Sequence, residues 1–204
     1  MTSSPAARRR ADARRSRAAI LDAAVRILDE RPDASLGAIA EAAGVTRQTV
    51  YAHFSSRERL LAGVVERITE EVAAAMDAAA PDEGPAAGAL LRVLDAAERA
   101  ARRSPALTRR ISELPAGAEA DRDRHLPVTD RIARVVERGR RGGEFDDSLP
   151  LDWLVSVIVR LAHAAGEERA AGRMADRDAA HALHVSVLRV LGAAGAAEGR
   201  PSAR

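Results

Sequence analysis

Apolar residues recur at helical spacing in one segment after another, and short stretches rich in proline, glycine or charge separate these segments. In the first segment the apolar positions form a stripe that would be buried (Ile20, Leu21, Ala24, Ile27 and Leu28). The predicted helices cover residues 12–29, 36–43, 46–54, 57–80, 86–103, 104–114, 128–141, 151–171 and 176–192. The pattern therefore predicts an all-α fold. Apart from the two ends of the chain, we expect the stretch between 115 and 127 to be the least ordered part.

The helix expected at 151–171 is apolar nearly all round, so both of its sides must be covered. In a chain of 204 residues, one cover would be the protein's own core and the other a second subunit. The helix at 176–192 repeats the pattern. The sequence therefore predicts a homodimer in which each subunit contributes these two helices to a four-helix bundle. The candidate interface residues are Ile158, Ala162, Ala165, His184 and Leu188.

Residues 35–54 predict two short helices joined by a tight turn. Ser35 and Thr46 are good N-caps, and Gly44 can take the positive φ that ends the first helix. In the second helix Val50 and Phe54 share the inner face. The other side chains are mostly polar and face elsewhere, as in a helix-turn-helix that binds DNA (Arg47, Gln48, Thr49, Tyr51 and His53).

Two short helices around a glycine also occur in proteins that do not bind DNA, so the pattern alone leaves both interpretations open. The aromatic residues favour DNA binding, because two of the four in the chain, Tyr51 and Phe54, lie at the end of this one helix. Phe54 has an ordinary core role, whereas the Tyr51 hydroxyl suits a phosphate contact.

The motif Gly44-Val45-Thr46-x-x-x-Val50-Tyr51-x-His53-Phe54-x-Ser56-Arg57-Glu58-x-Leu60-Leu61 resembles the signature of the tetracycline-repressor (TetR) family of bacterial transcriptional regulators. The resemblance spans roughly residues 15–62. It implies that the second helix enters the major groove and that Arg47, Gln48 and Thr49 read bases. Ser35, Thr46, Tyr51, His53 and Arg57 match positions that hold phosphates, and Ala52 would add little beyond a thymine-methyl contact.

Charge divides the chain unevenly, although the net charge is only +2. Residues 1–60 hold 11 Arg against 7 acids, whereas residues 61–204 hold 21 Arg against 23 acids. We expect a disordered basic arm at 1–13, a helix-turn-helix domain at 14–60, a helical ligand-binding and dimerisation domain at 61–195 and a disordered tail at 196–204. The arm would either add phosphate contacts or serve as a solubilising tail.

Several classes of function find no support in the sequence. Cysteine is absent, which excludes disulfides and thiolate chemistry, and no phosphate loop, zinc-protease motif or nucleophile elbow is present. The chain is therefore not expected to be an enzyme, and we expect no cofactor. His181 and His184 are spaced i, i+3 without an evident third ligand, and Asp121, Asp123 and His125 are equally weak as a metal site. With no apolar run of 18 residues and no secretory signal, we expect a cytoplasmic, nucleoid-associated protein that does not enter membranes.

The resemblance implies a dimeric repressor of a palindromic operator, released by a small-molecule effector that the sequence does not identify. The two recognition helices would lie about one DNA turn apart, roughly 34–36 Å. The expected effector pocket is lined by Leu90, Leu94, Arg110, Ile111, Leu114, His125, Trp153 and Val157, with His163 as a further polar anchor. Two other interpretations remain: a ligand-independent architectural DNA-binding protein of this fold, and an all-helical enzyme or interaction module.

Overall fold

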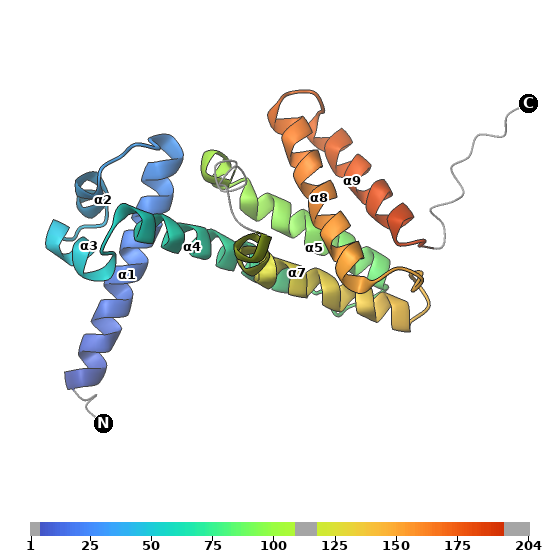
Figure 1. Ribbon diagram of the computed structural model, residues 1–204, viewed down its shortest axis with the longest axis horizontal. Coiled ribbons are helices and arrows are strands. Elements are labelled where there is room, and N and C mark those ends of the chain that lie inside the picture. Colours follow the sequence, from blue (N-terminus) through green and yellow to red (C-terminus); the bar gives the residue numbers. More distant parts are fainter. Residues whose placement is uncertain (1–4, 109–117, 194–204) are drawn as a thin grey trace, which may run out of the picture. The chain divides into compact units, whose positions relative to one another are not determined.

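The computed structural model describes residues 5–108 and 118–193, and over these ranges the chain is helical and contains no strand (Figure 1). The all-α prediction is confirmed. The helices with their bounds are α1 (Pro5–Glu30), α2 (Leu36–Ala42), α3 (Arg47–His53), α4 (Arg57–Asp77), α5 (Ala86–Ala101), α7 (Ala118–Arg141), α8 (Leu151–Ala170) and α9 (Asp176–Val190). No helix in the described ranges is long and apolar enough to cross a bilayer.

The chain forms two compact units. The first, here called the head, comprises Met1–Glu70 and Ala101–Ala120; the second, here called the body, comprises Glu71–Ala100 and Asp121–Arg204. The division falls inside α4, so this helix contributes its first part to the head and its last turns to the body. The expected boundary between residues 60 and 61 lies ten residues earlier.

The head packs α1, α2, α3 and the start of α4 around one apolar core. Its buried members are Ile20, Leu21, Ala24, Leu28, Ile39, Ala40, Val50, Phe54, Leu60, Val64 and Leu107. Gly63 allows α4 to approach closely, because a Cβ there would lie 3.0 Å from Cε1 of Phe54 and 3.1 Å from Cδ2 of Leu21. The core holds α3 by its inner face and leaves the outer face in solvent.

The body packs α5, α7, α8 and α9 around a separate core. The largest of its fully buried side chains are those of Met76, Leu90, Ile132, Leu154, Ile158 and Leu191, each at most 2% exposed. Gly139 is also buried there, because its backbone lies against the ring of Phe145. α8 and α9 pack side by side as an antiparallel pair (Figure 1).

Arginine side chains and one carboxylate hold the turn between α4 and α5. Arg92 donates hydrogen bonds to the carbonyls of Ala80 and Glu83, at 3.0 and 2.8 Å. Arg138 donates to the carbonyl of Gly84 at 2.7 Å. Glu144 accepts the backbone N–H groups of the first turn of α5, and these hydrogen bonds lower the pKa of its carboxyl group. The break expected from the two prolines in this region is therefore an ordered turn.

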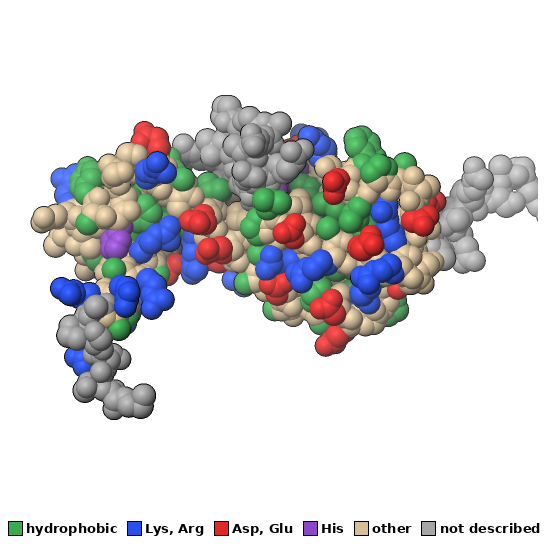
Figure 2. All heavy atoms as spheres, turned by 60° about the horizontal axis from the view of Figure 1, so that its bottom comes forward, with side chains coloured by type: hydrophobic (Ala, Val, Ile, Leu, Met, Phe, Trp, Pro, Cys, Tyr) green, Lys and Arg blue, Asp and Glu red, His purple; other side chains and the backbone are tan. Residues whose placement is uncertain are grey.

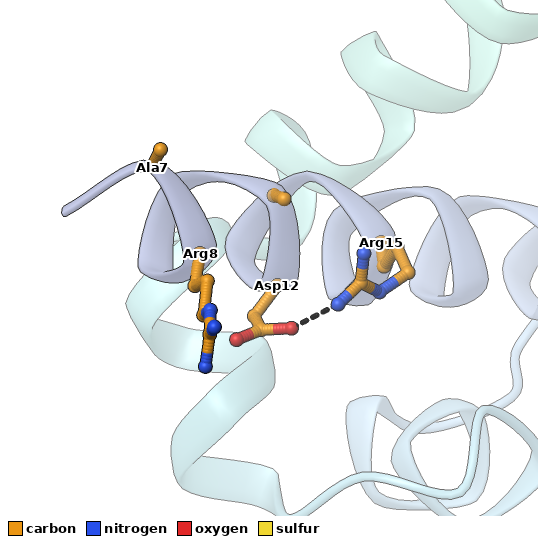
Figure 3. Close-up of a pocket in the computed structure, with 5 residues that line it drawn as sticks. Ala7, Arg8, Asp12 and Arg15 are labelled. Carbon is orange, nitrogen blue, oxygen red and sulfur yellow. Dashed lines mark hydrogen bonds and ion pairs between the residues drawn. The ribbon is translucent and has the colours of Figure 1, made fainter. Parts of the chain in front are cut away.

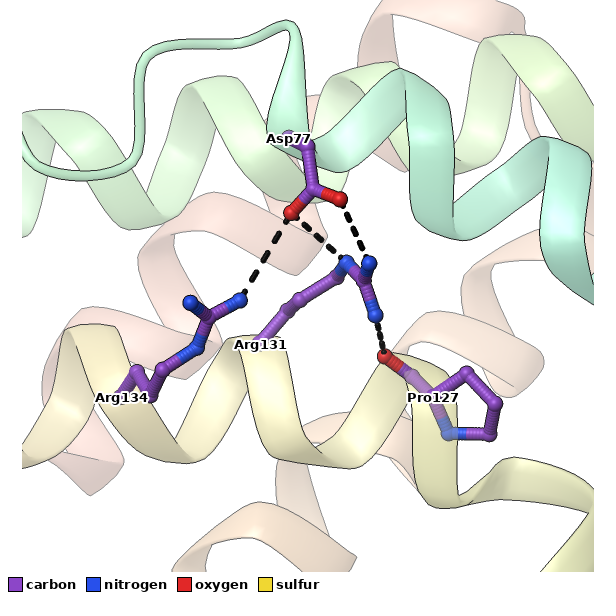
Figure 4. Close-up of polar contacts among 4 residues, drawn as sticks. All are labelled: Asp77, Pro127, Arg131 and Arg134. Atoms are coloured by element: carbon purple, nitrogen blue, oxygen red, sulfur yellow. Dashed lines mark hydrogen bonds and ion pairs between the residues drawn. The ribbon is translucent and has the colours of Figure 1, made fainter.

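The last residue of α4 is tied to α7 within the body (Figure 4). Asp77 accepts two hydrogen bonds from Arg131, with Nε–Oδ1 at 2.8 Å and Nη2–Oδ2 at 2.5 Å, and Arg134 lies 3.6 Å from the same carboxylate. The hydrogen bond from Arg131 is the main cause of the lowered pKa of Asp77. Arg131 also donates to the carbonyl of Pro127, which lies inside α7. The C-terminal end of α4 thus has a fixed partner.

Two boundaries differ from those expected. α1 begins at Pro5, so residues 5–13, expected to be a disordered arm, are helical. Most of these residues are alanine and arginine, which favour helix. The second half of α1 is fixed in the head core, so residues 5–13 only have to extend an existing helix and need not nucleate a new one. α7 likewise begins at Ala118, whereas the sequence predicted a helix only from residue 128. The expected tail at 196–204 lies outside the described residues.

Candidate nucleic-acid interface

Local hydrogen bonds build the motif at residues 35–54. The Ser35 hydroxyl accepts the N–H of Ala38 at 3.2 Å, and the Thr46 hydroxyl accepts that of Thr49 at 3.1 Å. Both predicted N-caps are therefore confirmed. Gly44 has φ +66, as predicted, and its N–H donates to the carbonyl of Glu41.

The turn between the two helices is a Schellman motif. The N–H of Val45 donates to the carbonyl of Ala40 at 3.0 Å. Together with the hydrogen bond from Gly44 to Glu41, this is the pair of hydrogen bonds that defines the motif. α3 follows after a single further residue, so its direction relative to α2 is set by this turn and by the shared core.

One face of α3 is open to solvent. Arg47, Gln48, Tyr51 and Ala52 are exposed and lie at positions i, i+1, i+4 and i+5 of the helix. The opposite face is held in the core by Val50, which is 0% exposed. Guanidinium, amide and phenol groups are the donors and acceptors that proteins use on base edges and phosphates.

Arg47 is exposed, and its side chain also has a close neighbour within the motif. A Cβ at Gly37 would lie 3.0 Å from its Nε, so the guanidinium stem rests against the backbone of α2. The absence of a side chain at Gly37 leaves this space open. The sequence prediction did not include Gly37, and the single glycine inside a short helix was the signal that could have pointed to a close neighbour.

Thr49 is the weakest of the three predicted base readers. Its side chain is half-buried, and its hydroxyl lies 2.9 Å from that of Thr46, in the capping hydrogen-bond group. Its hydroxyl is thus engaged within the motif, in contrast to the side chain of Gln48. The structure leaves two exposed candidates for base reading, Arg47 and Gln48.

Arg57 has a structural role in the head that the sequence did not predict. Its Nη1 donates to the carbonyl of Ala34 at 2.6 Å, and its Nη2 donates to the carbonyl of Pro32 at 2.8 Å. The guanidinium therefore closes the loop before α2. The phosphate contact predicted for Arg57 stays a prediction, and it would have to use guanidinium N–H groups that these two hydrogen bonds leave over.

The C-terminal end of α3 carries three rings. Tyr51 is 50% exposed, whereas His53 is half-buried beside Phe54, with ring centroids 6.4 Å apart. Arg17 of α1 lies over the ring of Phe54, with its guanidinium carbon 5.5 Å from the ring centroid. The same guanidinium forms an ion pair with Glu66, whose Oε2 lies 3.2 Å from Nη2 of Arg17. Arg17 was missed from the sequence, because nothing local connects it with a helix some thirty residues further along.

The predicted pocket residues do not share one environment in the body. Leu90 and Leu94 are buried in the core, so an effector that touches them has to enter between packed helices. His125 lies against His163, with ring centroids 5.6 Å apart. Arg110, Ile111 and Leu114 lie outside the described residues, and Val157 is half-buried.

Two side chains of α8 contradict their assignments. Trp153 is 59% exposed, so it faces outward from the first turn of α8 and is not a wall of an interior pocket. Ile158 is 0% exposed within one protomer, because the body's own core covers it, and it cannot form an interface with a second copy. Ala162, Ala165 and Leu188 are partly buried and keep some surface for a partner.

His181 and His184, the two histidines spaced i, i+3, do not face a common partner. Nε2 of His184 lies 2.7 Å from Oδ1 of Asp95 on α5, so this histidine links α9 to α5. His181 is exposed. Within residues 5–108 and 118–193, no group of three or more His, Asp or Glu side chains is placed to hold a metal ion.

A small head with an exposed, hydrogen-bonding second helix, followed by a larger helical unit, is an arrangement typical of DNA-binding transcriptional regulators. Residues 20–64 match the family model of the bacterial regulatory proteins of the tetR family. The resemblance read from the sequence is confirmed for this N-terminal part of the chain, which carries a domain of the tetR family, and solved structures of TetR-like regulators share the fold of the chain.

Individual relatives agree with this identification. The HTH-type transcriptional repressor LfrR of Mycolicibacterium smegmatis is 43% identical over 81 residues, which cover 40% of this chain and 43% of LfrR. The crystal structure of LfrR from Mycobacterium smegmatis in complex with proflavine is 29% identical, has a TM-score of 0.60 and aligns over 85% of this chain and 95% of that one. RolR in complex with resorcinol has a TM-score of 0.68 at 21% identity, covering 93% and 97% of the two chains, and shows the shared fold alone.

Proposed function

We propose that this protein is a homodimeric repressor that binds a palindromic operator through α3 and leaves it when a small molecule binds the body. The observation that carries the proposal is the exposed face of α3, where Arg47 and Gln48 are presented by a helix whose other face is locked in the head core. Arginine pairs with guanine and glutamine with adenine in the major groove, each contact giving about 1–3 kcal/mol of discrimination.

The dimer is supported by apolar surface on the body. Trp153 and Leu149 are 59% and 44% exposed at the start of α8, and Leu188 of α9 is only partly covered by its own protomer. Large exposed apolar side chains grouped on neighbouring helices favour association, and a two-fold pair of heads would read two half-sites.

Release by an effector is supported by the relatives and by α4. LfrR has been crystallised with proflavine and RolR with resorcinol, so members of this fold hold organic molecules. α4 begins in the head and ends in the body at Asp77, where Arg131 holds it. A molecule that binds one arrangement of the body more tightly than another would shift the population of DNA-binding heads through this helix.

Selection of bound sequences from a random duplex library, at moderate salt, tests the proposal. We expect a palindromic consensus whose half-sites are about one helical turn apart. Failure to enrich any sequence with a folded protein would reject operator binding, and a non-palindromic consensus would reject the dimer. An architectural protein would instead bind all duplexes with similar affinity.

The variants Arg47→Ala and Gln48→Ala identify the base readers. Each should flatten the preference at one or two positions of the half-site, with roughly 10-fold less discrimination against the wrong base. Arg59→Ala is the matched control, because Arg59 is an exposed arginine of the head that belongs to α4 and not to α3. Equal losses on operator and random DNA for Arg47→Ala would show that this arginine does not read a base.

A further inference from the structure

The first half of α1 carries two separate rows of charged side chains. Helical geometry places residues four and seven positions apart on one face. Arg10, Arg14 and Arg17 form one such row, here called the open row. Arg8, Asp12 and Arg15 form the other row, here called the paired row. Its middle residue is an aspartate, whereas the middle residue of the open row is an arginine.

The paired row neutralises part of its own charge. The Arg15 guanidinium forms an ion pair with the Asp12 carboxylate, one turn away on α1 (Figure 3). These side chains and Arg8 border a shallow hollow of about 220 Å³, together with Ala7 and Ala11. An anion near this row would meet a carboxylate as well as two cations.

The open row contains no acid and starts beside the recognition helix. Arg17 lies over Phe54, which directly follows α3, and its charge is shared with Glu66. Arg10 and Arg14 are exposed, and neither forms an ion pair with any side chain in the described ranges. Figure 2 shows basic side chains gathered along this part of α1.

The open row lies on a rigid helix and not on a flexible tail, so its arginines have a fixed spacing. Arg10 lies seven residues from Arg17, which is about 10 Å along a helix. The same helix continues into the head core through Ile20, which is 0% exposed, so the arginines move with α3 as one body. Successive phosphates on one DNA strand are about 3.4 Å apart along the axis, so 10 Å corresponds to about three of them.

We propose that Arg10 and Arg14 bind the sugar–phosphate backbone of duplex DNA just outside the half-site that α3 reads. This inference rests on the proposed operator binding and extends it. The contacts add affinity on any sequence, lengthen the protected segment by about three base pairs on each side and leave base preference unchanged.

The test compares two double variants that remove the same charge from the same helix. Arg10→Gln with Arg14→Gln removes the open row, and Arg8→Gln with Arg15→Gln removes the cations of the paired row. Binding to one duplex is measured from low to moderate salt, with circular dichroism as a check of helix content. The open-row variant should lower the slope of log K against log salt by about 0.9 for each phosphate that the protein no longer neutralises.

The paired-row variant should change the slope by less than half as much, and both variants should keep the sequence preference of the unmodified protein. Equal slopes for the two variants, while the unmodified protein still binds its operator, would overturn the inference and leave the proposed function intact. A protein that selects no sequence from the duplex library would instead overturn the proposed function.

Discussion

The head and the body use their polar side chains in different ways. In the head, two hydroxyls cap short helices from within the same turn, and Gln48 and Tyr51 remain exposed. In the body, charged side chains reach across the fold, as Arg138 does to the turn after α4 and Glu144 does to the start of α5. The open face of α3 therefore presents hydrogen-bonding groups to solvent, whereas these charged side chains of the body are engaged within it.

The same contrast appears in the packing. The core of the head leaves one face of α3 in solvent, while the body brings a helix backbone directly against an aromatic ring, at Gly139 and Phe145. Damage to the body should thus appear first as reduced stability. Damage to the open face of the head should appear first as weaker DNA binding.

The largest effect is expected for Gly139→Ala. A Cβ at this position would lie 2.2 Å from Cδ2 of Phe145, so the ring or α7 must move. Although alanine favours helix, overpacking of this kind should destabilise the body by about 1–3 kcal/mol. The measurement is thermal unfolding followed by circular dichroism. Gly166→Ala is the control, because nothing lies within 4 Å of its added Cβ, and it should be neutral or slightly stabilising.

The next effect is expected for Arg57→Gln in the head. The variant leaves the partly buried carbonyls of Pro32 and Ala34 without their charged donor and should cost about 1–2 kcal/mol of stability. The salt dependence of DNA binding should stay as it is, since this guanidinium faces the loop. A slope that falls by about 0.9, with stability unchanged, would instead support the phosphate role predicted from the sequence. Arg59→Gln serves as the exposed control.

The smallest effect is expected for Asp77→Asn at the end of α4. This pair is partly exposed, so its contribution at neutral pH is about 0.5–1 kcal/mol. The pKa of Asp77 is lower in the folded protein than in the unfolded chain, so its stabilisation is present above the unfolded value and is lost as the pH falls through the folded value. The unfolding curves of variant and unmodified protein should differ at neutral pH and converge in acid. A difference that persists unchanged in acid would show that the charge of Asp77 is not its cause.

Local chemistry explains which predictions succeeded. The caps Ser35 and Thr46, the positive φ of Gly44 and the buried position of Val50 depend on neighbours within a few residues, and all of them follow from spacing. The expected start of α4 also matches the structure at Arg57. For these features of the head, sequence and structure agree because short helices and tight turns are specified by adjacent residues.

The misplaced residues share a different property: their surroundings come from remote parts of the chain. Ile158 is apolar, as a dimer interface requires, but the core of its own body covers it, and Trp153 lies outside although its type favours the interior. Periodicity reports that a helix has an apolar side and does not report which neighbour covers it. The helical start of α1 at Pro5 was missed because a run of arginines has no apolar period.

The sequence by itself thus determined the all-α fold, the helix-turn-helix and the family that its N-terminal part resembles, because each depends on periodicity, caps and a local motif. The tertiary structure decided which polar side chains are already engaged. It gave Arg57 to a loop, placed Arg47 against Gly37 and set Arg17 over Phe54. Such contacts join residues far apart in the chain, and their geometry exists only after the helices have packed.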